Sequence, residues 1–180
     1  MKKLLKVSLL TLLSYLLQAT VAHHIAIGGV APNLAFALAA VVTVALGKKY
    51  TFCLSMAVGY LLEIMLPALD YINLIAYPVC AMIPAIFLAD KSERALEERQ
   101  ALGKKTTQLE PHIRTLLCAC ISTLFFEVVN VFYTFLSGVS LNAAHFGRAI
   151  FDVVYTVAIT FVLQYPLRRW LGVHRIPKAR

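Results

Sequence analysis

The sequence predicts an all-α integral membrane protein: a single domain folded as a bundle of six transmembrane helices, with the N- and C-termini cytoplasmic. Composition is the first observation. The 180 residues are 60% hydrophobic and 14% charged, whereas a soluble domain carries roughly 25% charged residues. Six long apolar runs divide the chain, and almost all basic residues fall in alternate gaps between them. Because short cytoplasmic loops retain Lys and Arg, this partition predicts the orientation of every span.

Sixteen of the seventeen Lys and Arg residues lie in gaps assigned to the cytoplasm, and only Arg148 lies in an intervening gap. The net charge of +8 therefore reflects topology. The basic residues are spread over loop ends rather than grouped on one face, so nucleic acid is not an expected partner and the lipid bilayer is. The sixteen are Lys2, Lys3, Lys6, Lys48, Lys49, Lys91, Arg94, Arg99, Lys104, Lys105, Arg114, Arg168, Arg169, Arg175, Lys178 and Arg180.

The first three spans are expected at residues 4–22, 33–46 and 51–66. The first has the ~20 residues that a crossing requires. It also resembles a secretory signal ending at Thr20-Val21-Ala22, but we favour an uncleaved span. The second is short for a full crossing, which predicts that it tilts less than its neighbours or is partly embedded in protein.

The last three spans are expected at residues 72–88, 114–136 and 148–167. Pro78 and Pro84 predict a kink in the fourth span, because each removes a backbone hydrogen bond. Between the fourth and fifth spans, residues 90–112 form the only long polar stretch. We expect a cytoplasmic loop there, either a solvated linker or short interfacial helix, or a docking surface for a cytoplasmic partner.

Small residues recur every four positions in the second and third spans, so each set lies along one helix face. In lipid, small faces allow helix backbones to approach closely. The sequence leaves open whether the face in the second span packs within the bundle or against another protein's span. The two faces consist of Ala35, Ala39, Thr43 and Gly47, and of Ser55 and Gly59, with Glu63 continuing the second.

Three acidic residues lie inside predicted spans, all in the outer half of the bilayer. At about 1.5 Å rise per residue, Glu63 lies roughly 18 Å and Glu127 roughly 20 Å from the cytoplasmic start of its span. Asp152 lies one turn below the outer surface, where Arg148 is positioned to pair with it. We therefore expect an outer-half polar cluster or pocket formed by Glu63, Glu127, Asn130, Arg148 and Asp152. Such acids mark functional sites or hold helices together through hydrogen bonds.

No spacing of nucleophile and base, phosphate-binding glycine loop or metal-ligand motif is present. We therefore expect no catalytic residues, no cofactor and no metal site. The adjacent His23 and His24 diverge on any regular element, and they are more simply interfacial polar residues than ligands.

The order and spacing of several short motifs resemble the MreD family of bacterial rod-shape-determining membrane proteins, over almost the whole chain. The motifs are Pro32-Asn33-Leu34, Gly47 before a basic turn, Gly59-Tyr60-Leu61-Leu62-Glu63, Phe126-Glu127 and Tyr165-Pro166-Leu167-Arg168-Arg169.

The resemblance implies a non-enzymatic, multi-pass protein of the bacterial inner membrane. It would bind the single-span protein MreC and act with the MreB filament and peptidoglycan synthases in the rod complex, or elongasome, to support cell shape and lateral peptidoglycan synthesis. The alternative is a six-helix substrate-binding subunit similar to those of energy-coupling-factor vitamin importers, which bind ligand in an outer-half pocket. A more distant alternative is a membrane enzyme that uses Glu127 or Asp152 as an acid or base.

Overall fold

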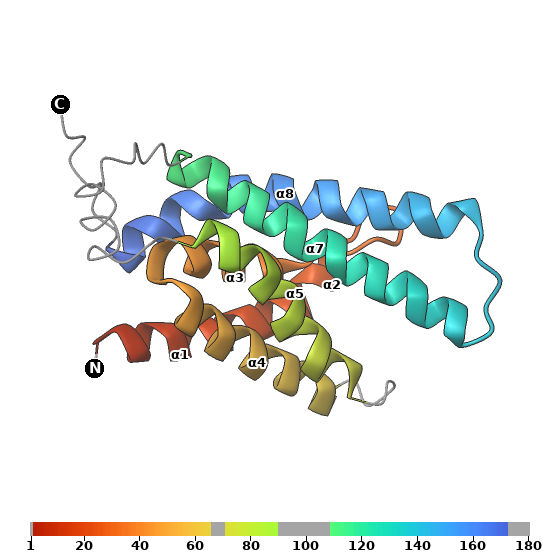
Figure 1. The fold of residues 1–180 in the computed structure, drawn as a ribbon, viewed down its shortest axis with the longest axis horizontal. Coiled ribbons are helices and arrows are strands. Elements are labelled where there is room, and N and C mark those ends of the chain that lie inside the picture. Colours follow the sequence, from red (N-terminus) through yellow and green to blue (C-terminus); the bar gives the residue numbers. More distant parts are fainter. Residues whose placement is uncertain (1, 66–70, 90–108, 173–180) are drawn as a thin grey trace, which may run out of the picture.

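The computed structural model describes residues 2–65, 71–89 and 109–172, and within them the protein is helical, with no β-strand (Figure 1). The first helical stretch is α1 (Lys2–Leu16), the π-helical η1 (Leu17–Val21) and α2 (Ala22–His24). Then come α3 (Leu34–Leu46), α4 (Lys48–Met65), α5 (Ile72–Leu88), α7 (Pro111–Leu136) and α8 (Ala143–Leu171).

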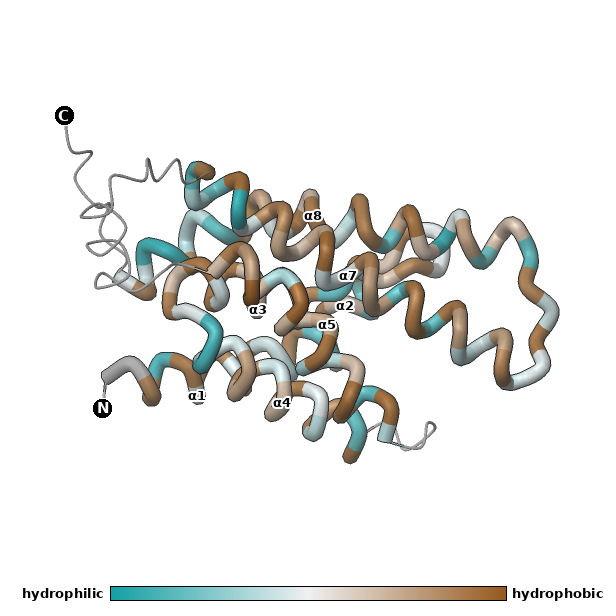
Figure 2. Tube along the Cα trace, in the orientation of Figure 1, coloured by the Kyte–Doolittle hydropathy of each residue, from teal (hydrophilic) through white to brown (hydrophobic). Residues whose placement is uncertain are grey.

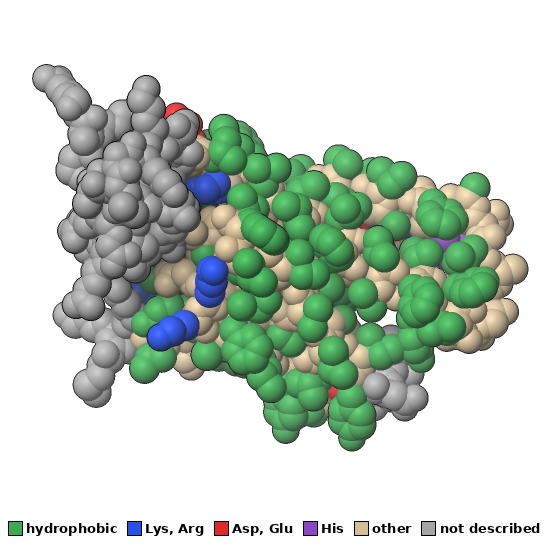
Figure 3. All heavy atoms as spheres, in the orientation of Figure 1, with side chains coloured by type: hydrophobic (Ala, Val, Ile, Leu, Met, Phe, Trp, Pro, Cys, Tyr) green, Lys and Arg blue, Asp and Glu red, His purple; other side chains and the backbone are tan. Residues whose placement is uncertain are grey.

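Three helical stretches in the described part of the chain are long and apolar enough to cross a membrane: Leu4–His24, Pro111–Leu136 and Ala143–Leu171. Leu34–Leu46 and Ile72–Leu88 are shorter apolar helices. Hydrophobic residues extend along the helices (Figure 2), and hydrophobic side chains cover most of the visible helical surface (Figure 3). Exposed Phe, Val, Ile and Leu side chains along α7 and α8 require an apolar environment. The molecule is a membrane protein.

Helix α3 is the centre of the fold. It packs against α1, α4, α5, α7 and α8, and every residue from Leu34 to Val44 is buried. This short helix is enclosed by protein, which is one of the two alternatives that its length predicted. Gly47 ends it with a φ of 89°, a conformation that favours glycine.

Consecutive helices run back and forth between the two ends of the molecule (Figure 1). The start of α1, the α3–α4 junction, the start of α7 and the end of α8 lie at one end, where the visible Lys and Arg side chains gather (Figure 3). Lys6 Nζ there donates to the carbonyl oxygens of Trp170 and Leu171, at 3.0 and 3.3 Å. The α7–α8 hairpin extends beyond the other helices at the opposite end.

Several boundaries differ from those predicted. Helix α8 begins at Ala143 rather than 148, because Asn142 and His145 form a capping box there. Helix α7 begins at Pro111, in the first turn, where proline costs no hydrogen bond. Helix α5, by contrast, has the predicted bounds and contains both Pro78 and Pro84. Positions 66–70, between the third and fourth predicted spans, and positions 90–108 of the predicted polar loop lie outside the described residues.

Candidate functional site

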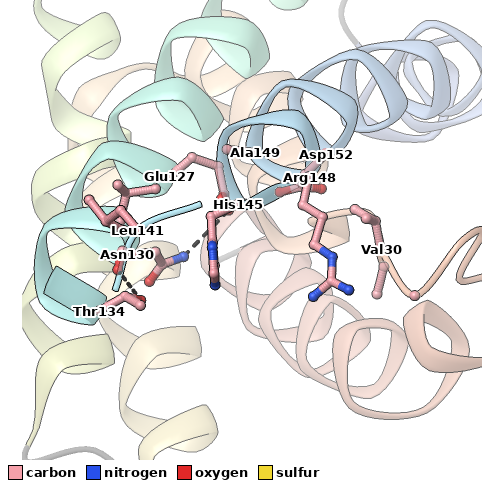
Figure 4. Close-up of a pocket in the computed structure, with 12 residues that line it drawn as sticks. Val30, Glu127, Asn130, Thr134, Leu141, His145, Arg148, Ala149 and Asp152 are labelled. Carbon is pink, nitrogen blue, oxygen red and sulfur yellow. Dashed lines mark hydrogen bonds between the residues drawn. The ribbon is translucent and has the colours of Figure 1, made fainter. Parts of the chain in front are cut away.

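A cavity of about 220 Å³ lies between α7, α8 and the segment that precedes α3. Non-helical residues Gly29, Val30 and Ala31 form one wall. The polar lining comes from the two long helices: Glu127 and Asn130 on α7, and His145, Arg148 and Asp152 on α8 (Figure 4). The structure thus brings together four of the five residues expected in the outer-half cluster.

The carboxyl groups of Glu127 and Asp152 interact directly across the gap between α7 and α8, and Figure 4 shows them turned towards each other. Asp152 is only 6% exposed, and Glu127 is partly buried. Asn130 Nδ2 donates to Glu127 Oε1 at 3.4 Å, from one turn further along α7. Two acids facing each other repel when both are charged, unless a cation or a proton lies between them.

Asp152 is connected to the start of α3 by a chain of hydrogen bonds. Thr156 Oγ1 donates to Asp152 Oδ1 at 3.1 Å and accepts from the Asn33 backbone N–H at 2.8 Å. The Asn33 side chain caps α3 by accepting from Phe36 N at 3.2 Å, and its Nδ2 donates to Tyr77 Oη at 3.4 Å. The acid therefore lies near a helix N-terminus, where negative charge is stabilised.

Arg148 does not pair with Asp152, which corrects the expectation from their spacing. No ion pair joins the two side chains in the described structure, and the carboxyl of Asp152 is instead held by Thr156. Figure 4 shows the Arg148 guanidinium and the His145 ring extending in the same direction, away from the carboxyl pair. His145 Nδ1 accepts from the Asn142 backbone N–H at 3.2 Å. The cavity therefore has carboxyl groups at one side and basic side chains at the other.

Glu63 does not join this cavity. Its two carboxylate oxygens accept from the backbone N–H groups of Tyr71 and Asn73, each at 3.0 Å. These groups lie at the start of α5, where backbone N–H groups lack helical partners. The depth of Glu63 along its helix is similar to that of Glu127, but depth alone does not specify direction. Glu63 is turned towards α5 and away from α8.

The small-residue faces are used inside the molecule. Ala35, Ala39 and Thr43 are buried in α3, and Thr43 Oγ1 accepts from Thr51 Oγ1 of α4 at 3.0 Å. Ser55 is buried on α4. A Cβ added at Gly59 would lie 2.7 Å from the Asn73 carbonyl oxygen. Of the two alternatives left open for the second span, the structure favours packing within the molecule.

Two residues that the sequence analysis did not single out make polar contacts at the start of α3. Tyr77 stacks on Phe36, contacts Phe126 and receives the Asn33 hydrogen bond. Gln18 Oε1 accepts from Ala35 N at 3.2 Å and so completes the N-terminus of α3. Each is a polar residue within an apolar run, which is the signal that identifies it. Both also line a second cavity of about 460 Å³ between α1, η1, α4 and α5.

The fold and the cavity define the class of protein: a membrane protein whose described residues form helices, with a polar cavity between the long helices α7 and α8. Comparison with protein-family models, curated proteins and solved structures finds no match to this chain.

Proposed function

We propose that this protein is a non-enzymatic scaffold of the bacterial cell-elongation complex. In this proposal it crosses the inner membrane six times with both termini cytoplasmic, and binds a single-span partner similar to MreC. Through that partner it acts with an MreB-like filament and peptidoglycan synthases.

One observation carries the proposal: two of the motifs that support the resemblance to the MreD family, Pro32-Asn33-Leu34 and Phe126-Glu127, lie far apart in the sequence and are joined by one set of contacts in the structure. Asn33 of the Pro32-Asn33 motif bonds to Tyr77. Tyr77 contacts Phe126 at a ring-centroid distance of 5.0 Å. Glu127, the next residue, faces Asp152, which Thr156 links back to Asn33. These contacts form a ring that begins and ends at Asn33. We take the ring as support for a shared role of the two motifs.

The back-and-forth helix arrangement supports the proposed topology. The described basic helix ends gather at one end of the molecule (Figure 3), as expected for a cytoplasmic face. The α7–α8 hairpin extends at the other end, where a partner with a large outer portion would be reached.

The test is affinity purification of the tagged full-length protein in mild detergent, with identification of bound proteins. We expect a single-span membrane protein with a large outer domain, and we expect depletion to round rod-shaped cells. Co-purification of an ATPase module, with unchanged cell shape on depletion, would overturn the scaffold proposal.

The polar cavity favours a second candidate, the substrate-binding subunit of an energy-coupling-factor-type importer. A volume of about 220 Å³ holds a small molecule, and charged groups inside a membrane protein commonly contact a substrate. The same purification distinguishes the candidates, because only the importer subunit binds an ATPase module.

A further inference from the structure

We propose that the cavity between α7 and α8 binds a primary ammonium group that carries an anionic group a few bonds away. A phosphoethanolamine headgroup and a free amino acid share this chemistry. The inference goes beyond the scaffold proposal, because binding is a property of the isolated protein and does not require any partner.

The carboxyl pair determines where the ammonium group binds. Glu127 and Asp152 face each other at the cavity, and no lysine or arginine of the described structure pairs with either carboxyl. Neutral groups, Asn130 and Thr156, donate hydrogen bonds to them. A primary ammonium has three N–H donors. Placed against this pair from the cavity, it donates to both carboxyl groups and compensates their negative charge.

The basic side chains determine where the anionic group binds. Arg148 lines the same cavity and makes no ion pair with Asp152. It precedes Asp152 by one helical turn, which corresponds to about 6 Å along the axis. Arg148 and His145 extend in one direction, away from the carboxyl pair (Figure 4). A guanidinium recognises a phosphate or a carboxylate through paired N–H donors. The acidic side of the cavity thus matches the ammonium group of the ligand, and the basic side matches its anionic group.

The cavity wall contributes shape rather than charge. Gly29, Val30 and Ala31 supply only small or apolar side chains, and Asn130 adds an amide beside Glu127. A quaternary ammonium such as choline has the same charge but no N–H donor and three added methyl groups. The cavity should therefore discriminate ethanolamine from choline.

The experiment uses the full-length protein in nanodiscs that contain equal amounts of phosphatidylethanolamine, phosphatidylcholine and phosphatidylglycerol with identical acyl chains. The protein is released from the nanodiscs, and the lipids that remain bound to it are identified by native mass spectrometry. A second arm measures thermal stabilisation of detergent-purified protein by free phosphoethanolamine, phosphocholine and glycine. A bound phosphatidylethanolamine supports the lipid source, and stabilisation by a free primary-amine zwitterion supports the soluble source.

The variants Glu127→Gln and Asp152→Asn should each weaken binding at least tenfold, and Arg148→Gln should weaken it severalfold. Glu110→Gln is the matched control, because Glu110 is exposed at the start of α7, at the other end of that helix. The headgroup comparison on the wild type needs no variant and remains decisive if a substitution prevents folding. Equal binding of ethanolamine and choline forms, binding of neither, or equal losses in Glu110→Gln and Glu127→Gln would overturn the proposal.

Discussion

Asn33 illustrates how one side chain organises the centre of this protein. It accepts from Phe36 N, donates to Tyr77 Oη, and its backbone N–H is held by Thr156. It lies at 5% exposure, so water cannot replace these partners. The sequence motif Pro32-Asn33 is thus a helix start that also ties α3 to α5 and α8.

Replacing Asn33 with alanine should lower the free energy of unfolding by about 1–2 kcal/mol, because it removes the cap of α3 and one partner of a buried hydroxyl. Asn33→Ser keeps a capping oxygen and should retain most of the stability. The measurement is thermal or denaturant unfolding of the purified protein in detergent. Equal stability of the alanine and serine variants would show that the cap contributes little.

Gly59 and Gly147 provide a matched pair of glycine substitutions within helices. A Cβ at Gly59 would meet the Asn73 carbonyl oxygen at 2.7 Å and Tyr77 Cβ at 3.2 Å, whereas nothing lies within 4 Å of a Cβ at Gly147. Gly59→Ala should therefore force α4 and α5 apart and cost about 1–3 kcal/mol. Gly147→Ala should equal or exceed wild-type stability, because alanine favours a helix. The same unfolding assay compares them, and a stable Gly59→Ala variant would contradict the close packing.

At the scale of the element, Glu63 of α4 caps the N-terminus of α5, a role that a side chain at the start of the helix usually has. The residue before α5 is Tyr71, whose side chain makes no capping hydrogen bond and whose φ of 58° is unusual for a non-glycine residue. Both carboxylate oxygens of Glu63 satisfy backbone N–H groups of this helix start. An acid on one helix thus fixes where the next helix begins.

Glu63→Ala should lower the free energy of unfolding by about 2–3 kcal/mol, since it removes two hydrogen bonds to a charged acceptor and leaves two N–H groups unpaired. Glu110→Ala is the control: Glu110 is exposed before α7 and makes no capping hydrogen bond. Hydrogen exchange at the start of α5 should rise in the first variant only. Unchanged exchange there would mean that another group caps the helix.

Apolar length and charge predicted the helices more reliably than they predicted polar contacts. The short second predicted span is enclosed by protein, one of the two alternatives that its length left open, and Glu127 and Asp152 meet between α7 and α8. Periodicity places a residue on a face but does not say which neighbour that face meets. For this reason the sequence places Glu63 in a cluster that it does not join, because its carboxylate binds the start of α5. It likewise predicts a pair between Arg148 and Asp152, whose carboxyl accepts from Thr156 instead. Tyr77 and Gln18 were missed because each is a single polar residue without a repeating pattern.

At the scale of the whole molecule, the positions of the helix ends make the proposed orientation measurable. The α3–α4 junction, which carries Lys48 and Lys49, lies at the basic end, and the α7–α8 loop lies at the other end (Figure 1). Single cysteines at these two positions should face opposite sides of the membrane. The four native cysteines are first replaced by alanine, since Cys53 is exposed.

Ser140 and Lys49 are the two labelling positions, because both are exposed and they lie at opposite ends of the molecule. Ser140→Cys should react with a membrane-impermeant maleimide in intact cells whose outer barrier is permeable to the reagent. Lys49→Cys should react only after the membrane is opened, because the proposed topology places the basic end in the cytoplasm. Labelling of both cysteines in intact cells would rule out two opposite faces. The reverse pattern would invert the protein and place the carboxyl cavity near the cytoplasm, beyond the reach of an outer partner domain.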